Sequence, residues 1–493
     1  MSTSVQAPAA GERHLAASLY KPLTEAGLAK IADAALEVLE KSGMAVYSPT
    51  GFEALEKAGA MVDRETRTVR LPRALVEDAI DSNPSSITLF ARDDAHHAVL
   101  EGNRVHYGTG GTALYVLDPD TGQRRPSTNA DVRLNARLSQ ELDRVHVFTI
   151  NVFPNEIDDR EAIDVNRFFH ALDCTTKHVM GGVYALQGCQ DVVAMAQMMA
   201  GGAEALRAKP FVSFITLVIS PFKIDEHYGE MTCYFAQQGL PVVVPTEPIC
   251  GTTSPVTLAG NVLTHIAETL GGIALVQAVN KGAPGICGSV GSTCDLRTMD
   301  HLGGPVERGM INAAVAQLAQ HFGIPLYSTA GTSDAKEVDL QAAYESAVTN
   351  TLVAMSGANY IHDALGLMEA DLTIGYEKLV LDDEILGMAD RVLQGIEVTD
   401  DTLAVDLLCE KGPGKDFLAE PHTVEHMRGE FFLPRLANRA RREGWDPAES
   451  ALARAKAFVA QVRASEPGPR IEAGVRSQIL ERFPQIVSEV DVA

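Results

Sequence analysis

The sequence predicts an α/β protein built on a (β/α)8 TIM barrel, with an N-terminal α+β cap and a C-terminal helical extension. Between residues 146 and 385, short and almost continuously apolar runs alternate with stretches of helical periodicity. Such runs are typical of parallel strands that helices cover on both faces. About eight of these units follow one another over roughly 240 residues, which is the number that closes a barrel. An open doubly wound sheet is the alternative, but no unit carries a dinucleotide-binding fingerprint.

The chain divides into four predicted regions. We expect a flexible tail over residues 1–21, the cap over 22–145, the barrel over 146–385 and the helical extension over 386–493. The tail has neither the basic start nor the apolar segment of a signal peptide. No uninterrupted apolar stretch reaches the roughly 20 residues that a bilayer span needs. These features predict a cytoplasmic protein that does not cross a membrane.

The cap is expected to combine two helices with a small sheet. Apolar residues at helical spacing, including Leu28 and Ile31, predict a helix that begins near Thr24 and ends at Gly43. A second, shorter helix lies in GFEALEKAGA and ends at Gly59. The alternating segments VRLP, SITLFA and HAVLEGNRVHYG predict the strands of one small sheet.

The barrel strands are predicted from eight apolar runs, the last of which is the least clear. They are HVFTINVF, HVMGGVY, FVSFITLVIS, PVVVPTEP, APGICGSV, IPLYSTAG, NYIHDALG and EKLVLDD. Beyond residue 386 the chain is charged, and amphipathic helices are predicted over 402–410 and 448–464. We expect this extension to pack on the barrel or to mediate assembly.

Composition excludes some classes of partner and cofactor. The formal net charge is −24, with 41 Lys+Arg against 65 Asp+Glu, and such a field repels the phosphates of nucleic acids. The seven cysteines are scattered and never form a CxxC pair, which suits free thiols in a reducing compartment. Cys287 and Cys294 do not have the spacing of a zinc signature. We expect no metal bound directly to the chain.

Side chains that act in a TIM barrel lie at the carboxyl ends of its strands. This rule selects Asn151, Phe153, Tyr184, Phe214, Thr216, Thr246, Glu247, Ser289, the turn 328–336 and residues 360–363. Tyr107 precedes the glycine-rich GTGG, which is not a phosphate loop because neither a helix nor Gly-Lys-Ser/Thr follows it. The chain also has no GxSxG or HExxH sequence and no strong pair of carboxylates. The residues alone therefore predict a barrel enzyme with a small-molecule site whose chemistry a second group carries.

Two turns at the expected mouth of the barrel contain charged residues. In TAGTSDAKEVDLQAAYE, residues 329–345, Ser333 or Asp334 is expected to cap the following helix. Glu307 and Arg308 lie in the first turn of the helix that starts at GGPVERG. Arg308 and that helix N-terminus are suited to bind a carboxylate, and a surface ion pair is the competing interpretation.

Four long stretches resemble the trimethylamine methyltransferase family of corrinoid-dependent enzymes, which are TIM barrels. They are SPVTLAGNVLTHIAETLGGIALVQ (254–277), INAAVAQLAQHFGIPLY (311–327), AGTSDAKEVDLQAAYE (330–345) and LQGIEVTDDTLAVD (393–406). The resemblance runs from about residue 22 to about residue 420. It implies a methyltransferase that works with a corrinoid.

One position departs from the family pattern. The archaeal trimethylamine enzymes carry pyrrolysine just before Ser-Asp-Ala-Lys, and this chain has Thr332 there. Members without pyrrolysine resemble enzymes for quaternary amines, among which we favour glycine betaine, giving dimethylglycine. A quaternary ammonium releases a neutral tertiary amine, so its methyl group is already activated. The protein then has mainly to hold and orient the substrate, while the corrinoid carries the chemistry.

The resemblance implies roles for the residues selected above. The aromatic cage for the trimethylammonium group is expected among Tyr107, Phe153, Tyr184, Phe214 and Tyr344. The expected carboxylate partners are Arg308, Asn151 and His362, with Arg297 behind them, and Glu247 would add negative potential. The residues expected to face the corrinoid are Gly331, Thr332, Ser333 and Asp334. None of these residues is expected to act as an acid, base or nucleophile.

The resemblance also implies partners. A separate corrinoid protein is required, because the chain shows no histidine-containing cobalamin domain of its own, and another enzyme would pass the methyl group to a folate or a related acceptor. A homo-oligomer is expected. Proline betaine, carnitine or a sulfonium analogue are alternative substrates. A non-catalytic betaine-binding barrel is the alternative from another class, and a closed barrel mouth would favour it.

Overall fold

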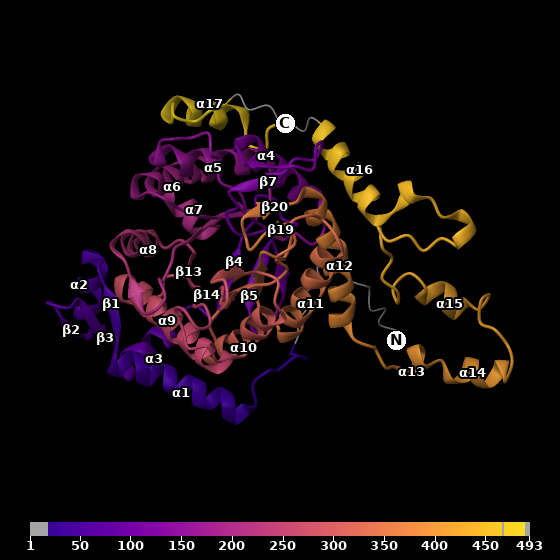
Figure 1. Cartoon of the computed structure of the whole chain (residues 1–493), viewed down its shortest axis with the longest axis horizontal. Coiled ribbons are helices and arrows are strands. Elements are labelled where there is room, and N and C mark those ends of the chain that lie inside the picture. Colours follow the sequence, from indigo (N-terminus) through magenta and orange to yellow (C-terminus); the bar gives the residue numbers. More distant parts are fainter. Residues whose placement is uncertain (1–17, 466–467, 489–493) are drawn as a thin grey trace, which may run out of the picture.

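The computed structural model describes residues 18–465 and 468–488. Most of the expected tail lies outside the described residues. Figure 1 shows a barrel surrounded by helices, with the first helices of the chain packed along one side and the C-terminal segments along another.

Eight parallel strands form the barrel, as the sequence predicts. In spatial order they are β6 (His106–Tyr107), β9 (Val147–Thr149), β10 (His178–Gly182), β11 (Val212–Ile215), β13 (Val242–Thr246), β14 (Gly285–Ser289), β17 (Leu326–Thr329) and β18 (Tyr360–His362). Each strand pairs in parallel with the next one along the chain. Strand β18 pairs with β6, and a parallel bridge between Gly108 and Val147 joins β6 to β9. The sheet therefore closes on itself.

A helix follows each strand and covers the outside of the barrel. These helices are α4 (Asn129–Glu141), α5 (Arg160–Cys174), α6 (Leu186–Ala200) with α7 (Ala203–Ala208), α8 (Glu226–Gln238), α9 (Leu258–Val279), α10 (Val306–Phe322), α11 (Leu340–Ser356) and α12 (Tyr376–Gln394). Among the described residues, α9 is the one helix long and apolar enough to cross a membrane, but 83% of its apolar window is buried inside the molecule. That burial is typical of a core helix.

One of the eight predicted strands is wrong. The run EKLVLDD lies inside α12, where Lys378 and Asp382 form a buried ion pair one helical turn apart. A short apolar run is compatible with a strand or with a buried helix, and here the buried helix forms. The strand that completes the barrel is β6, which lies within the range expected for the cap. Only two residues of β6 pair as a strand, so the sequence contains no apolar run to mark it.

The predicted helices of the cap are confirmed. Helix α1 (Glu25–Lys41) starts where Thr24 Oγ1 accepts a hydrogen bond from Gly27 N, and it ends before Gly43 in the left-handed region. The other cap elements are β1 (Met44–Val46), α2 (Pro49–Lys57), β2 (Met61–Asp63), β3 (Thr68–Arg70) and α3 (Arg73–Ser82). The expected single small sheet is wrong. The segment VRLP includes the end of β3, which forms a sheet with β1, β2 and β12 (Lys223–Ile224). The segments SITLFA and HAVLEGNRVHYG form strands of other sheets.

A β-hairpin fills the amino-terminal end of the barrel. It consists of β4 (Ser86–Leu89) and β5 (Ala98–Glu101). Its buried side chains, among them Leu89 and Leu100, pack with inward residues of the barrel strands such as Val243 and Ile286. Because this end is closed by apolar packing, the carboxyl end of the strands is the end available for a ligand.

Shorter strands border the carboxyl end of the barrel. They are β7 (Tyr115–Leu117), β8 (Arg124–Pro126), β15 (Thr293–Asp295), β16 (Asp300–Leu302), β19 (Leu367–Met368) and β20 (Thr373–Ile374). After α12 the chain forms α13 (Asp400–Leu403), α14 (Val405–Lys411), α15 (Pro421–His426), two 3-10 turns, α16 (Ala451–Ala464) and α17 (Ala473–Arg482). Helix α16 packs against α12 and α4.

Candidate functional site

A network of charged side chains lies at the carboxyl ends of the barrel strands. Arg308, in the first turn of α10, forms an ion pair with Asp371 from the loop between β19 and β20, with 2.9 Å between Nη1 and Oδ2. His301 of β16 lies 3.3 Å from Asp371 and 3.6 Å from Glu247, which directly follows β13. Asp363, which directly follows β18, lies 4.0 Å from Arg308. Three βα connections, those after β13, β14 and β18, therefore contribute to one cluster, which we call the mouth cluster.

The mouth cluster is buried at its base and open at its top. The Arg308 side chain is 1% exposed and that of Asp363 is 3% exposed. The side chains of Asp371, His301 and Glu247 are 21%, 26% and 40% exposed. Arg308 is thus not the surface ion pair of the competing interpretation. A molecule arriving at the carboxyl end of the barrel would meet Glu247 and His301 first.

Three acidic residues share the mouth cluster with one arginine and one histidine. Burial by itself lowers the pKa of His301, but the hydrogen bond to Asp371 and the negative charges of Asp371 and Glu247 together outweigh burial and raise this pKa above its usual value. The pKa of Asp371 is held low because Arg308 and His301 outweigh the effect of burial. Burial raises the pKa of Glu247. With Glu247 ionised, the cluster carries an excess of negative charge, which suits a cationic ligand.

Part of the Arg308 guanidinium has no hydrogen-bond partner. Its Nη1 donates to Thr332 Oγ1 at 2.8 Å and to Asp371. Its Nε and Nη2 make no hydrogen bond within the described part of the chain, and the same holds for Asp363 Oδ1. Buried groups of this kind normally have partners, so an unpaired N–H edge is suited to bind an anionic group.

Residues with positive φ are concentrated in the loop that follows β18. Asp363 has φ 58° and Asp371 has φ 71°, and Glu369 and Ala370 between them are also in the left-handed region. This conformation costs a residue with a side chain of order 1 kcal/mol, and it is enriched at functional sites. The backbone of this loop places both aspartates beside Arg308.

The turn after β17 forms the base of the mouth cluster. Gly331 has φ 82°, and its carbonyl oxygen accepts a hydrogen bond from Lys378 Nζ at 2.8 Å. Thr332 is 1% exposed and its side chain is directed at Arg308, while Ser333 is buried and donates to Glu345 at 2.6 Å. These two side chains are covered by neighbouring residues, and the expectation that the turn faces the corrinoid stays a prediction.

Asp334 does not cap the helix that follows it, and neither does Ser333. The N-cap of α11 is Asp339, which accepts a hydrogen bond from Ala342 N at 3.1 Å. Asp334, partly buried, instead accepts from Gly303 N at 2.7 Å and from Gly304 N at 3.1 Å. The loop between the turn and the helix is longer than the sequence suggests, which frees Asp334 to fix the segment that carries Arg308.

Two of the five expected cage residues come together. The rings of Phe153 and Tyr184 meet edge to face, with centroids 5.4 Å apart, beyond the ends of β9 and β10. The Arg167 guanidinium lies over the Tyr184 ring at 5.1 Å. Asp164 accepts hydrogen bonds from Tyr184 N and Ala185 N, and burial raises the pKa of Asp164 to about 6. Both rings are only partly buried, so they are accessible to a ligand.

The other three expected cage residues lie elsewhere. Tyr107 belongs to β6, and its buried side chain lies on the outer face of the barrel, where it contacts Asp390 of α12. Phe214 stacks on Phe235 of α8 with ring centroids 3.9 Å apart. Tyr344 is 58% exposed on α11. Alternation along a strand directs every second side chain outward, and the exact register was not evident from the sequence.

Of the residues expected to bind a substrate carboxylate, some lie at the mouth cluster and others do not. Arg308 lies in the mouth cluster. His362 is buried within the barrel, stacked on Tyr327 with centroids 3.9 Å apart, and its Nε2 is 2.9 Å from Asp363 Oδ2. Asn151 donates a hydrogen bond to Asn135 of α4. Arg297 is 88% exposed in the β15–β16 turn and pairs with Asp295.

Sequence reasoning missed His301 and Asp371, although it included Asp363 by position. His301 lies in a hairpin and Asp371 lies in a loop, and neither has a local signal that marks it. Buried Glu268 of α9 was also missed. It accepts hydrogen bonds from Ser220 Oγ and Phe222 N, at 2.6 and 2.7 Å, and burial raises its pKa to about 7. This carboxyl group holds the loop after β11 against the end of β13.

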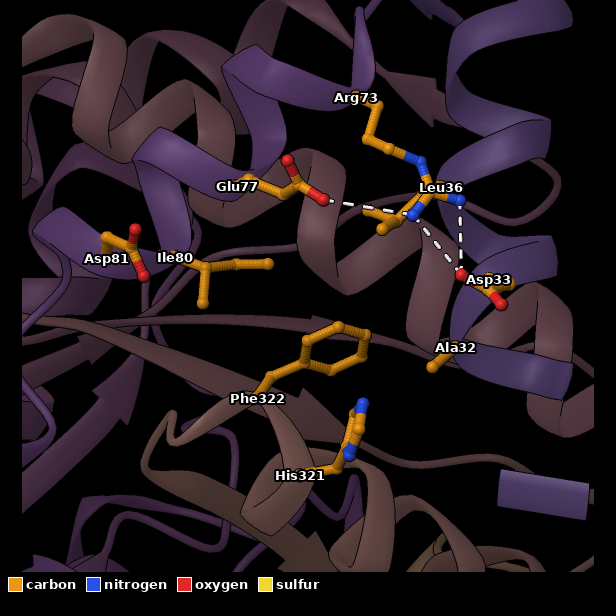
Figure 2. A pocket seen from close by; sticks show the side chains of 9 residues that line it. All are labelled: Ala32, Asp33, Leu36, Arg73, Glu77, Ile80, Asp81, His321 and Phe322. Carbon is orange, nitrogen blue, oxygen red and sulfur yellow. Dashed lines mark hydrogen bonds and ion pairs between the residues drawn. The ribbon is translucent and has the colours of Figure 1, made fainter. Parts of the chain in front are cut away.

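A surface pocket of about 320 Å³ lies far from the mouth cluster. Figure 2 shows it between α1, α3 and the last turn of α10, with Phe322 and His321 on one side and Arg73 paired with Asp33 and Glu77 on the other. At ~1.5 Å per residue, His321 is about 20 Å along α10 from Arg308. The pocket is therefore at the opposite end of the barrel and does not serve the mouth cluster.

The described cysteines offer no metal site. All seven thiols are free, and burial raises the pKa of Cys287. Cys294 Sγ lies 3.5 Å from the carbonyl oxygen of Cys250. Within the described residues, two groups of histidine and carboxylate side chains are close enough to hold a metal ion. One is the trio of Glu247, His301 and Asp371, and the other lies in the C-terminal region.

A closed parallel barrel with strained loops, a buried arginine and paired aromatic rings at its carboxyl end has the architecture of a TIM-barrel enzyme. Residues 4–484 match the model of the trimethylamine methyltransferase (MTTB) family. The chain belongs to this family, and it is a methyltransferase.

Curated relatives cover most of the chain. A trimethylamine methyltransferase MttB of Desulfitobacterium hafniense (strain DSM 10664 / DCB-2) is 37% identical over 78% of this chain and 77% of its own length. A glycine betaine methyltransferase of Desulfitobacterium hafniense (strain Y51) is 30% identical over 86% and 90%. A trimethylamine methyltransferase MttB of Methanosarcina barkeri is 34% identical over 73% and 74%.

A solved structure also resembles this chain. It is the monomethylamine methyltransferase MtmB of Methanosarcina barkeri, with a TM-score of 0.45, 14% identity and coverage of 95% of this chain and 94% of that chain.

Proposed function

We propose that this methyltransferase moves a methyl group from a quaternary amine, with glycine betaine favoured, to the Co(I) of a corrinoid carried by a separate protein. The observation that carries the proposal is the environment of Thr332. At the position where pyrrolysine is expected in trimethylamine enzymes, a threonine side chain is buried and hydrogen-bonded to Arg308. A substrate that needs no activation at nitrogen is consistent with this residue.

The charges of the mouth cluster support a cationic substrate with an anionic end. Glu247, Asp363 and Asp371 outnumber Arg308 and His301, so the cluster favours a trimethylammonium group. The unpaired N–H edge of Arg308 is suited to a betaine carboxylate. The rings of Phe153 and Tyr184 would each contribute about 0.5–2 kcal/mol to binding the cation.

The chain contributes by binding and orientation. When bound, the corrinoid supplies the nucleophile that accepts the methyl group. The exposed edge of Glu247, His301 and Asp371 is compatible with access by a corrinoid held on a second protein, since these side chains are 40%, 26% and 21% exposed. We infer that the buried turn 331–334 forms the wall behind the substrate. Holding the methyl carbon in line with the open side would provide most of the rate.

The cellular setting follows from the same proposal. We infer that the protein works in the cytoplasm as a homo-oligomer, and that a further enzyme passes the methyl group to a folate or a related acceptor. No group of the mouth cluster has to donate a proton, because the leaving amine is neutral.

The test uses the full chain with a partner corrinoid protein reduced to Co(I). Addition of glycine betaine should change the corrinoid absorbance and release dimethylglycine in a 1:1 ratio to the methylated corrinoid. Proline betaine, carnitine and a sulfonium analogue are run in parallel, because turnover of one of these alone would change the substrate and leave the reaction class intact. Trimethylamine is included because relatives of that name share up to 37% identity with this chain. Turnover of trimethylamine alone, or inactivity with every substrate while the partner is active, would refute the proposal, and the second result would favour a betaine-binding barrel.

A further inference from the structure

The C-terminal region contains an arm that the proposed reaction does not use. After α12, residues 395–449 extend from the barrel as a long excursion with α13, α14 and α15, and return at α16, which packs against α12 and α4 (Figure 1). We call residues 395–449 the arm. Two histidines and an aspartate from different helices of the arm lie together.

His422 and His426 are one helical turn apart on α15, and their ring centroids are 4.3 Å apart. Asp401 approaches them from α13. His426 Nε2 is 3.1 Å from Asp401 Oδ2, and His422 Nε2 is 3.1 Å from the Asp401 carbonyl oxygen. Within the described residues, one ligand atom from each of the three side chains lies within 4.8 Å of the other two.

The distance of 3.1 Å between His426 Nε2 and Asp401 Oδ2 is close to the spacing of neighbouring ligand atoms in a metal site. Zinc bonds to histidine nitrogen and carboxylate oxygen are about 2.0–2.2 Å long, so neighbouring ligand atoms of a tetrahedral site are roughly 3.3–3.5 Å apart. Histidines at i and i+4 on one face of a helix bind zinc in this way in other proteins. A carboxylate is a common third ligand, and water occupies a position that the protein leaves open.

A simple hydrogen-bonded pair does not account for the contact between Asp401 and His426. The Nε2 atom of His426 is shielded from solvent, yet it has no hydrogen-bond partner of acceptable geometry in the described part of the chain. It is nevertheless only 3.1 Å from the carboxylate oxygen. A nitrogen and an oxygen this close, outside hydrogen-bond geometry, are suited to act as two ligands of a common ion.

The trio at the barrel mouth is a weaker candidate for the same ion. There Arg308 lies 2.9 Å from Asp371, so a metal ion would have to compete with the guanidinium for direct coordination by the same carboxylate. In the arm, the described ion pairs give neither Asp401 nor the two histidines a lysine or arginine partner. A chain with a net charge of −24 also attracts cations in general.

We propose that Asp401, His422 and His426 bind a divalent transition-metal ion of the Zn²⁺ class, with water completing the shell. The ion links α13 to α15 and closes the loop that contains α14. Because the Asp401 side chain is 71% exposed, the ion exchanges with solvent, and its role is to fix the fold of the arm. This proposal differs from the expectation that the chain binds no metal, and it does not depend on the substrate.

The experiment measures zinc binding to the full chain, produced without a polyhistidine tag and stripped with a chelator. Titration against a chromophoric zinc indicator should show one site per chain. His422→Ala and His426→Ala should each weaken binding by about 10- to 100-fold or more, and Asp401→Asn should weaken it less. Zinc should also slow limited proteolysis between α13 and α15 in the unmodified chain and not in the histidine variants.

Two matched controls locate the ion. His227→Ala removes an exposed histidine outside both groups and should leave zinc affinity unchanged. His301→Ala disables the trio at the barrel mouth and should also leave it unchanged. Loss of the site in His301→Ala, unaltered affinity in the His422→Ala/His426→Ala double variant, or the absence of zinc binding to the unmodified chain would each overturn the proposal. Circular dichroism of each variant verifies that the barrel remains folded.

Discussion

Replacing Arg308 tests the central feature of the mouth cluster. Arg308→Met keeps much of the side-chain volume and removes the guanidinium, so the buried end of the cluster retains its carboxylates without a counter-ion. Asp371 loses the ion pair at 2.9 Å, and Asp363, which is 3% exposed, loses the cation 4.0 Å away. The double variant Arg308→Met/Asp371→Asn removes both charges of the closer pair.

The expected loss of stability follows from the burial of this pair. Removing one partner of a buried ion pair costs about 3–5 kcal/mol, because the remaining charge is left uncompensated. An unfolding entropy of about 2.1 cal/mol/K per residue gives roughly 1 kcal/mol per degree for 493 residues. Arg308→Met should therefore lower Tm by about 3–5 °C. The double variant should recover at least half of this loss, since an amide costs much less to bury than an unpaired carboxylate.

The two readouts are thermal unfolding and steady-state kinetics. Scanning fluorimetry at one fixed heating rate gives Tm for the unmodified chain, Arg308→Met and the double variant. The corrinoid-coupled assay gives KM for glycine betaine, which should rise strongly in both variants because each lacks the carboxylate-binding edge. Recovery of Tm without recovery of KM separates the structural role of Arg308 from its role in binding.

Equal Tm values for all three proteins would show that the Arg308–Asp371 pair is not a buried, coupled unit, and the description of the mouth cluster would then be wrong. An unchanged KM in Arg308→Met would remove Arg308 from the substrate site even if Tm falls. Arg308→Lys serves as the conservative control: it keeps the charge and loses the planar fork, so its Tm should fall less.

Three further predictions concern other parts of the barrel. Burial raises the pKa of Glu268 from 4.5 to about 7, so the stabilisation by the protonated carboxyl group is full below pH ~4.5 and is lost as the pH rises through about 7. Relative to Glu268→Gln, the unmodified chain should therefore lose about 3 kcal/mol of stability over that range. The measurement is the difference in Tm between the two proteins at pH 4.5 and at pH 8.5. A constant difference would contradict the assignment of this carboxyl group. Tyr184→Ala should raise KM for the quaternary amine by roughly 2- to 30-fold, while the matched control Tyr344→Ala on the exposed face of α11 should leave KM unchanged; equal effects would reject the aromatic pair. Leu100→Ala, in the hairpin that fills the amino end of the barrel, should cost about 2–5 kcal/mol of stability without changing KM, and a change in KM at constant Tm would show that this end takes part in binding.

Much of the fold could be predicted from local patterns. Seven apolar runs mark seven barrel strands because parallel strands covered by helices are apolar on both faces. The helix from Thr24 was predicted because a capping side chain and a glycine delimit it. Two errors concern the barrel strands. β6 pairs over only two residues, so no apolar run marks it. The run EKLVLDD is apolar because it packs as part of a buried helix, and over seven residues it cannot be told from a strand.

The sequence predicted which residues lie at the carboxyl ends of the strands better than it predicted the direction of their side chains. Arg308, Glu247, Phe153 and Tyr184 lie at the mouth because the chain enters it after each strand. Tyr107 and Phe214 do not, since a shift of one residue along a strand turns a side chain from the interior to the helices.

The sequence by itself determined the barrel, its resemblance to the methyltransferase family and the presence of Thr332 directly before Ser-Asp-Ala-Lys. These features depend on residues close together in the chain, where hydrophobic patterns and motifs can be recognised. Only the tertiary structure decided that Asp371 meets both Arg308 and His301, and that Asp401 meets two histidines of the arm. These contacts join loops tens of residues apart, and their geometry depends on strand register and on left-handed backbone that no local pattern encodes.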